Sequence, residues 1–465
     1  MHPLRDSVRQ AFASFLAVPT AVIVAFVLLA FGSYAVERTG TGWFRPVLGY
    51  MEAHVFGDPE ATSTLLGTIA TGVITITSIT FSLLLLALQQ SAGSLTHQVF
   101  DQFLRRRSNQ VYFGFFVGLT LYALITLATV APPFNPVLGA TLALVATVGA
   151  LYVLLLLIYS TINQMRPGEI IKTIHDHTLR ARQRQLPLLR RTRRAARLPA
   201  GDETPVLAPH DGYLQRIDLD TIAASLRQAQ APVEIVFEVP IGAYVAYHDR
   251  VAGVRAERGD DAIRVAAGVE GAIRLGRQRD IVTDPAYGIE QLTTIAWRSV
   301  STSQQNPAPG IATVHNLHDL LVRWAIAGRD ESGDDIGDQD EAELPVVYPD
   351  DVMMRLFGAF ESLAVVASES MQAQVYAQIV RTFALAIGEL ARPDQRRTGD
   401  LLLRTLPGLG DHVLTTELDD ALTGLVASLE RADCRDVAEA FRVARAGLAG
   451  SIGTLNSRAT RVPTA

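Results

Sequence analysis

Cysteine and lysine are nearly absent from this sequence of 465 residues. The single cysteine, Cys434, excludes a disulfide framework and every zinc site built from pairs of cysteines. Lys172 is the only lysine among 41 basic residues, and we attribute this mainly to GC-rich coding. Neither scarcity points to a particular function.

Catalytic and metal-binding motifs are also missing. The sequence contains no Walker loop, no HExxH and no G-x-S-x-G motif. In His175-Asp176-His177 the two imidazoles point to different faces of a helix, whereas His315 and His318 can share a face beside Asp319. Two nitrogens are too few for a metal site, and the Ser301-Thr302-Ser303 run has no visible base partner. We therefore expect neither enzymatic activity nor a cofactor or metal ion.

Charged residues are absent from three long windows, namely 11–36, 61–100 and 111–165. A membrane-spanning helix needs about 20 apolar residues, so the third window has room for two helices. Ala131–Pro136 contains three prolines and makes the turn between them. The first apolar run is too long for a cleaved signal peptide. The sequence predicts four spans, at 12–35, 64–89, 111–130 and 137–160.

Basic residues flank these spans asymmetrically. Arg5 and Arg9 precede the first span, Arg105–Arg107 lie between the second and the third, and ten basic residues follow the fourth between positions 166 and 197. Four spans place all three segments on one side, which the positive-inside rule makes the cytoplasm. We expect a multi-pass protein of the inner cell membrane, with both termini cytoplasmic and the large C-terminal region in the cytosol.

The second span carries a hydroxyl group at nearly every turn. At about 100° per residue, six hydroxyl side chains fall within an arc of about 80°, and Gln89 lies on the same face. One interpretation is packing, because small hydroxyl residues let membrane helices approach closely. The other is a wetted, pore-lining face within a homo-oligomer, with Arg105, Arg106 and Arg107 at its cytosolic mouth. The six residues are Thr64, Thr68, Thr71, Thr75, Ser78 and Ser82.

Two further features bear on the membrane part. The third span contains Gly114 and Gly118, a GxxxG pattern that favours close helix contact. No ionisable residue lies inside any span, although proton-coupled transporters usually place one at membrane depth. The spans are therefore compatible with a passive conduit or with a purely structural bundle.

An arginine-rich segment, RQRQLPLLRRTRRAAR, follows the last span. Basic clusters beside a membrane are attracted to anionic lipids, so we predict membrane lipids as partners. The segment lacks interleaved aromatic residues and any nucleic-acid-binding module, so we expect no nucleic-acid binding. The arginines predicted to contact lipid head groups are Arg182, Arg184, Arg190, Arg191, Arg193 and Arg194.

The rest of the chain divides by pattern. Short alternating runs between Pro205 and Val282 predict strands, and Thr283-Asp-Pro and the apolar spacing beyond Pro349 predict helices. The phrases APHDGY and IGAYVAYHD resemble half of a barrel-sandwich domain of the lipoyl or biotinyl type, but the lysine that would carry the cofactor is missing. The predicted parts are a four-span domain (1–164), a basic juxtamembrane helix (165–200), a small β domain (201–282), a helical pair (283–328), an acidic linker (329–344) and a helical C-terminal domain (345–465).

Two stretches of the sequence resemble a known protein family. The stretch TGVITITSITFSLLLLALQQSAGSLTHQVFDQFLRRRSNQVYFGFFVGLTLYALITL and the stretch TDPAYGIEQLTTIAWRSV resemble the bacterial predicted membrane proteins grouped as domain of unknown function 2254. The resemblance runs from the spans to about residue 327. In that family a Ser-Pro-Gly-Ile-Asn-Asp-Pro type of loop usually follows the second phrase, and here only Asn306-Pro307 of it remains. The resemblance implies the architecture and no activity.

The predicted fold class is an α-helical integral membrane protein with four spans and a cytosolic α+β region, made of a small β-barrel-like domain and a helical C-terminal domain. The leading functional hypothesis is an oligomeric channel or conduit for ions or small solutes, lined by the second span and regulated by the cytosolic region. The alternative is a membrane-anchored scaffold or sensor whose cytosolic domain binds a protein or ligand without transport. The sequence does not specify a protein partner.

Overall fold

The computed structural model describes residues 16–39, 45–54, 56–94, 107–132, 134–164, 166–199, 201–301, 306–330, 343–410 and 412–450. The chain divides into two compact units, Met1–Glu169 and Ile170–Ala465, which we describe separately as the first and the second unit. The predicted domain boundaries within these units stay predictions.

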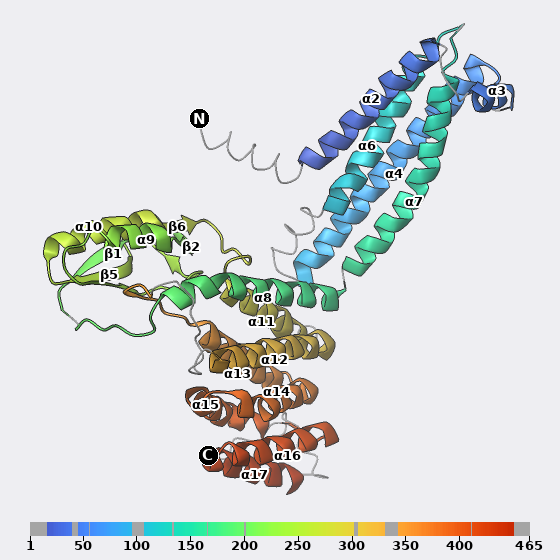
Figure 1. Ribbon diagram of the computed structural model, residues 1–465. Coiled ribbons are helices and arrows are strands. Elements are labelled where there is room, and N and C mark those ends of the chain that lie inside the picture. Colours follow the sequence, from blue (N-terminus) through green and yellow to red (C-terminus); the bar gives the residue numbers. More distant parts are fainter. Residues whose placement is uncertain are drawn as a thin grey trace. The chain divides into compact units, whose positions relative to one another are not determined.

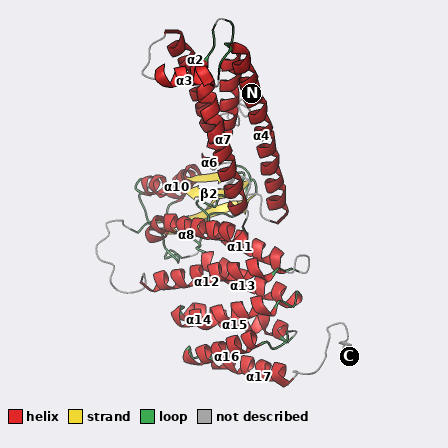
Figure 2. Cartoon of the chain, turned by 90° about the vertical axis from the view of Figure 1, so that its right-hand side faces the viewer, coloured by secondary structure: helices red, strands yellow, loops and turns green. Residues whose placement is uncertain are grey.

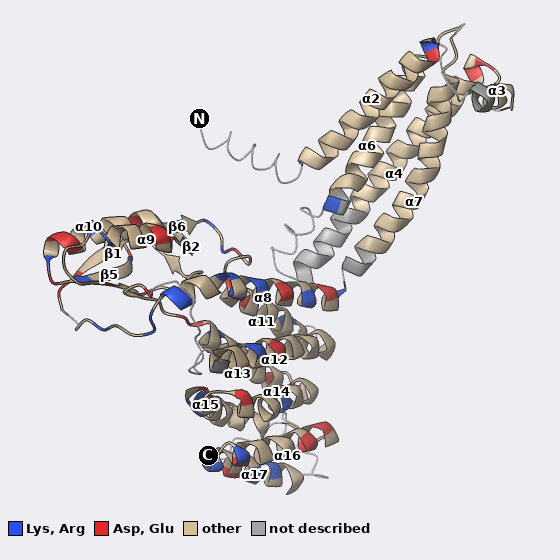
Figure 3. Cartoon of the chain, in the orientation of Figure 1, with Lys and Arg blue, Asp and Glu red and all other residues tan. Residues whose placement is uncertain are grey.

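The first unit is a bundle of long apolar helices (Figure 1). Four of its helices are long and apolar enough to cross a membrane, in agreement with the four predicted spans. Charged residues gather at the ends of these helices (Figure 3). The elements are α2 (Ala17–Thr39), the short α3 (Arg45–His54), α4 (Pro59–Ser94), α6 (Arg107–Ala128) and α7 (Val137–Gln164).

The two glycines of the GxxxG pattern lie where α6 packs closely against α2. A Cβ added at Gly114 would lie 2.9 Å from Pro19 Cα, and one at Gly118 would lie 2.6 Å from a ring carbon of Phe26. Gly114 therefore lets the two backbones approach, and Gly118 makes room for the Phe26 ring. The predicted close contact is confirmed.

Polar groups connect the bundle at the end that holds the α6–α7 turn. Glu37, near the end of α2, accepts a hydrogen bond from the Leu138 amide (2.8 Å) at the start of α7. The buried Tyr122 hydroxyl donates to the Gly139 carbonyl (3.0 Å), and the Asn135 amide donates to the Phe56 carbonyl (3.1 Å). The first amides of a helix lack partners within it, so a carboxylate from a neighbouring helix stabilises this end of α7.

The second unit begins along α8 (Pro167–Arg191) and contains two sheets. One sheet has the order β1-β5-β3-β7, in which only the β3–β7 pair is parallel, and the other has the order β4-β2-β6. Figure 2 shows the strands in yellow among the helices. The elements are β1 (Glu203–Leu207), β2 (Gly212–Ile217), α9 (Leu219–Leu226), β3 (Val233–Phe237), β4 (Tyr244–Val245), β5 (Arg250–Ala256), α10 (Gly259–Ala272), β6 (Ile273–Gly276) and β7 (Val346–Val347).

The barrel-like arrangement expected for this region is not supported. The described strands form two separate sheets, and neither closes on itself. Helix α10, which was not predicted from the sequence, leads from β5 in one sheet to β6 in the other. Its buried residues follow a helical spacing, with Ala262, Val265, Ala266, Val269 and Ala272 turned to the core shared with the sheets.

The rest of the second unit is a stack of helices (Figures 1 and 2). Apolar residues at helical spacing cover the faces that meet, such as Phe360 on α13 and Phe383 on α14, whose ring centroids lie 5.2 Å apart. Most of the predicted acidic linker lies outside the described residues. The elements are α11 (Pro285–Val300), α12 (Pro307–Asp330), α13 (Val352–Glu369), α14 (Ala373–Ala386), η2 (Ile387–Glu389), α15 (Arg392–Leu409), α16 (Thr416–Arg431) and α17 (Arg435–Gly450).

Candidate functional site

The six hydroxyl side chains of α4 lie on the outside of the bundle. Thr64, Thr68, Thr71, Thr75, Ser78 and Ser82 are all exposed, and we call them the hydroxyl face. The opposite side of α4, about 180° away at 100° per residue, is buried in the bundle and includes Leu66, Ile69 and Val73. The first unit therefore packs through the apolar side of α4 and leaves its polar side uncovered.

The hydroxyl face is hydrogen-bonded within its own helix. The hydroxyls of Thr68, Thr75 and Ser82 donate to carbonyls four residues earlier, at 2.8, 2.9 and 3.0 Å. Each hydroxyl keeps acceptor capacity for another partner. Gly67 and Gly72 flank the face, and a Cβ at either would meet nothing within 4 Å. Exposed Ile74, Ile79 and Phe81 lie beside the hydroxyl residues on the same helix.

Different charges lie toward the two ends of the hydroxyl face. A hollow of about 410 Å³ at its N-terminal end is lined by Asp58 and Glu60 together with Thr64 and Thr68. Arg107 is exposed and begins α6, at the opposite end of the bundle from the α6–α7 turn. The side chain of Gln89, and the predicted mouth residues Arg105 and Arg106, lie outside what the structure describes.

Three arginines of the basic segment are paired with carboxylates of the second unit. Arg182 donates two hydrogen bonds to Asp350 (2.8 and 2.7 Å), Arg191 donates to Asp220 (2.9 Å), and Arg193 to Glu343 (3.1 Å). Their side chains are only 16%, 19% and 17% exposed. Arg184 donates to the Val282 carbonyl (3.2 Å), while it and Arg190 and Arg194 are exposed. The predicted contact with lipid head groups stays a prediction for all six.

The structure brings two of the sequence's histidine motifs together. His175 on α8 is buried, and its Nε2 lies 2.8 Å from Asp319 on α12, which also accepts a hydrogen bond from Arg323 (2.7 Å). No group of three or more metal-ligating side chains is found in the described part of the chain. The pair joins α8 to α12, a contact that neither motif predicts by itself.

Asp319 is expected to make stability depend on acid pH. Burial by itself would raise the pKa of this carboxyl, but hydrogen bonds from Arg323 and His175 outweigh it and hold the pKa below its ordinary value of 3.8. The ionised carboxylate therefore stabilises the fold above pH 3.8, and this contribution is lost as the pH falls through the lower folded pKa. We expect Asp319→Asn to lower the Tm near neutral pH, and its difference from the unmodified protein to shrink below pH 3.8. Thermal unfolding followed by circular dichroism, with the exposed Asp400→Asn as control, checks this, and a difference that is constant with pH would contradict it.

A buried ion pair and a helix cap meet at the start of α11, and we call this place the junction. Asp284 is 2% exposed and caps the helix by accepting from the Tyr287 amide (3.0 Å). Arg279 donates to Asp284 (2.8 Å), pairs with Glu290, and lies over the Tyr287 ring at 4.6 Å from its centroid. Burial raises the pKa of Asp284, and the Arg279 guanidinium opposes that rise. Arg279 therefore fixes the loop before α11 against the helix that follows.

Two glycines allow this junction to pack closely. Gly242 has φ of +93°, and a Cβ there would overlap Asp284 Oδ2 and lie 2.8 Å from Oδ1. A Cβ at Gly288 of α11 would overlap the Thr178 hydroxyl of α8. The phrase Asp-Pro-Ala-Tyr-Gly-Ile thus combines a helix cap with a close approach of two helices. Only the cap was evident from the sequence.

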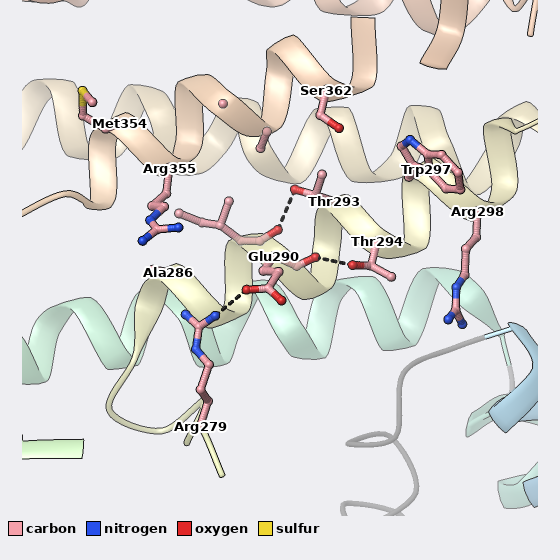
Figure 4. Close-up of a pocket in the computed structure, with 13 residues that line it drawn as sticks. Arg279, Ala286, Glu290, Thr293, Thr294, Trp297, Arg298, Met354, Arg355 and Ser362 are labelled. Carbon is pink, nitrogen blue, oxygen red and sulfur yellow. Dashed lines mark hydrogen bonds and ion pairs between the residues drawn. The ribbon is translucent and has the colours of Figure 1, made fainter. Parts of the chain in front are cut away.

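A cavity of about 440 Å³ lies between α11 and α13 (Figure 4). Guanidinium groups of Arg279 and Arg355 approach one end of it, and Trp297 and Arg298 lie at the other. Hydroxyl groups line the stretch between, on Thr293, Thr294 and Ser362. We call this space the α11–α13 cavity.

The α11–α13 cavity was not predicted from the sequence. A weak signal was present, because Glu290, Thr293, Thr294 and Trp297 recur at helical spacing within one of the family-like phrases. The α13 side, with Arg355 and Gly358, could not be joined to them without the tertiary structure. The remaining Asn306-Pro307 of the family-type loop starts α12, where Asn306 Oδ1 accepts from the Ala308 amide (3.3 Å).

Comparison with known proteins supports the membrane assignment. A family model described as predicted membrane protein (DUF2254) matches residues 13–382. Uncharacterized proteins of Mycobacterium bovis and Mycobacterium tuberculosis are 26% identical over 278 residues, which are 56% of this chain and 52% of theirs. The chain thus spans about half the length of the curated relatives it matches. No solved structure matches it.

Proposed function

We propose that this chain, which belongs to the DUF2254 family of predicted membrane proteins, forms a homo-oligomeric conduit for ions or small solutes, with α4 of each copy facing a shared axis. The proposed orientation puts both termini and the second unit in the cytoplasm of a cell with an inner membrane. The observation that carries the proposal is the outward position of the hydroxyl face.

A polar stripe on the outside of a membrane bundle is unusual, because lipid chains offer it no hydrogen-bond partner. A second copy of the chain does offer partners, and the open sides of Gly67 and Gly72 allow its backbone to approach. Closed rotational symmetry would then bring identical hydroxyl faces around one axis. The acidic hollow at Asp58 and Glu60 would lie at one mouth and Arg107 near the other.

Cysteine accessibility tests this proposal, and the single native cysteine makes a cysteine-free background simple to build. In Cys434→Ser protein we expect Thr68→Cys, Thr71→Cys and Thr75→Cys to react with a water-soluble thiol reagent in native membranes. Val73→Cys is the buried control, and Ile74→Cys is the control for an exposed apolar position on the same helix.

Two results distinguish a water-filled axis from a helix contact that excludes water. Reactivity at the three hydroxyl positions, with none at the two controls, supports water along the face. Disulfide cross-linking between copies at Thr75→Cys without any reactivity would show a dry helix contact and contradict the conduit. Reactivity at Ile74→Cys equal to that at Thr75→Cys would show that the reagent does not report a pore.

The α11–α13 cavity favours a second candidate function, a membrane-anchored sensor whose second unit binds a ligand. Its volume lies within the range of small-molecule sites, and charged, hydroxyl and aromatic side chains converge on it. This candidate predicts that Thr→Val changes across the hydroxyl face leave function intact, whereas loss of the chain after Arg197 abolishes it.

A further inference from the structure

We propose that one exposed side of α8 binds the head groups of anionic phospholipids, so that this helix lies along the membrane surface. The side consists of Lys172, Arg180, Arg184 and Arg190, which are all exposed, and we call it the α8 basic face. The first two were not among the residues predicted from the sequence to contact lipid. The inference uses the membrane assignment of the first unit and does not depend on permeation through it.

The α8 basic face is the polar side of an amphipathic helix. At 100° per residue its four side chains fall within an arc of about 120°. The opposite side of α8 is buried in the protein and includes Ile171, Ile174 and Ala181. These apolar side chains cannot insert into lipid, so only charge is available to attract a membrane. Binding through this face should therefore weaken steeply with salt.

The charges of the α8 basic face are not used inside the protein. Within the described part of the chain, none of the four side chains forms an ion pair. Arg180 donates to the backbone carbonyl of Asp176 (3.0 Å) and Arg184 to that of Val282 (3.2 Å). The three partly buried arginines of the basic segment, in contrast, are paired with carboxylates of the second unit. The fold thus neutralises one set of basic side chains and leaves the other for a partner outside the chain.

Three carboxylates reduce the charge of the α8 basic face without cancelling it. Glu169 and Asp176 lie on the same side of α8, and Asp280 is near enough to His177 to act on its pKa. Four basic side chains still outnumber these three carboxylates. Arg190 lies about 21 Å along the helix from Asp176, which is twice the Debye length of about 10 Å at 0.1 M salt. The C-terminal part of the face therefore keeps a positive potential.

The connection between α7 and α8 ties this face to a membrane. Helix α7 ends at Gln164, and α8 begins at Pro167. Three chain steps reach at most about 11 Å, and the five helical residues to Lys172 add about 7.5 Å. The face thus begins within about 19 Å of the end of an apolar span. Basic residues so close to a span are attracted to anionic lipids, by about 5-fold in binding per residue, which favours a lipid surface as the partner.

Fluorescence quenching in lipid nanodiscs tests the proposal on the full-length protein. A bimane label is attached to Gln183→Cys in Cys434→Ser protein, because Gln183 is exposed and lies within the arc of the α8 basic face. The nanodiscs contain phosphatidylcholine and a fixed fraction of a lipid with a nitroxide on its head group. Replacing about a third of the phosphatidylcholine by phosphatidylglycerol should increase quenching at least about 2-fold. Raising NaCl to about 1 M, where the Debye length is about 3 Å, should remove the increase.

Equal quenching with and without phosphatidylglycerol would overturn the proposal, since the face would then be a solvated surface or the site of another partner. An increase that persists in about 1 M NaCl would also contradict it, because charge would not be the cause.

Paired variants assign the effect to the α8 basic face. Arg180→Gln with Arg184→Gln should remove at least about half of the increase caused by phosphatidylglycerol, and Arg190→Gln, whose side chain makes no contact with a carboxylate of the described chain, should reduce it as well. The matched control is Arg396→Gln with Arg397→Gln on α15, which removes two exposed arginines and the same net charge elsewhere in the second unit. If the control pair lowers the increase as much as the α8 pair, net charge and not this face attracts the lipid, and the assignment is wrong.

Discussion

Replacing Glu234 by alanine is expected to destabilise the second unit by about 3 kcal/mol. Glu234 lies on the central strand β3 with its side chain 1% exposed. Its carboxylate accepts hydrogen bonds from the backbone amides of Arg197 (2.9 and 3.1 Å) and Leu198 (3.0 Å). Alanine would leave both amides without this acceptor and would weaken the attachment of the segment after α8 to the sheet.

Thermal unfolding of the purified protein, followed by circular dichroism, measures the effect of Glu234→Ala. A loss of about 3 kcal/mol corresponds to a fall in Tm of about 5 °C for the second unit, Ile170–Ala465. The matched control is Glu238→Ala, because Glu238 follows the same strand, is 42% exposed and pairs with Arg250. An exposed pair of this kind contributes at most about 1 kcal/mol. Equal Tm values for the two variants would show that Glu234 does not fix the segment.

The second large effect is expected at Gly288, where α11 meets α8. A Cβ at this position would overlap the Thr178 hydroxyl and lie 2.9 Å from the Thr178 Cβ, so the two helices would have to separate. Overpacking of this kind costs about 1–3 kcal/mol, which exceeds the gain of about 1 kcal/mol in helix propensity when alanine replaces glycine. Gly288→Ala should therefore lower the Tm, although the same change at an open helix position raises it.

A double-mutant cycle identifies the cause of the Gly288→Ala effect. Thr178→Ala removes the overlapping hydroxyl, so Gly288→Ala in that background should be less destabilising by about 0.5–3 kcal/mol. Gly358→Ala on α13 is the open-site control, because no atom lies within 4 Å of its added Cβ. If Gly288→Ala costs the same with threonine and with alanine at position 178, overlap with the Thr178 hydroxyl and methyl groups is not what requires glycine.

The agreement between sequence and structure is greatest where the signal is local. The four apolar spans were predicted because a helix in lipid must satisfy its own backbone and needs only length and low charge. The start of α11 was predicted because the Asp284 cap and Pro285 act within one turn. Helix α10 was missed although its apolar spacing is helical, since the surrounding turn residues favoured a reading as strands.

The candidate sites required the tertiary structure for different reasons. On α4 the sequence placed six hydroxyl groups on one side, but only packing of the bundle decided that this side is outward and that Leu66 and Val73 are inward. The α11–α13 cavity combines Trp297 with Arg355, and no periodicity connects positions on two helices separated by a third.

The sequence alone specifies how many helices can cross a membrane, where several helices begin, and that one face of α4 is polar, because these properties depend on neighbours within a few turns. Only the tertiary structure decided which groups the arginines of the basic segment contact. Arg182 pairs with Asp350, 168 residues away, and Arg193 with Glu343, 150 residues away. A guanidinium binds whichever carboxylate the fold brings within about 3 Å, and a cluster that the sequence presents as a lipid-binding surface is in part an internal connection of the second unit.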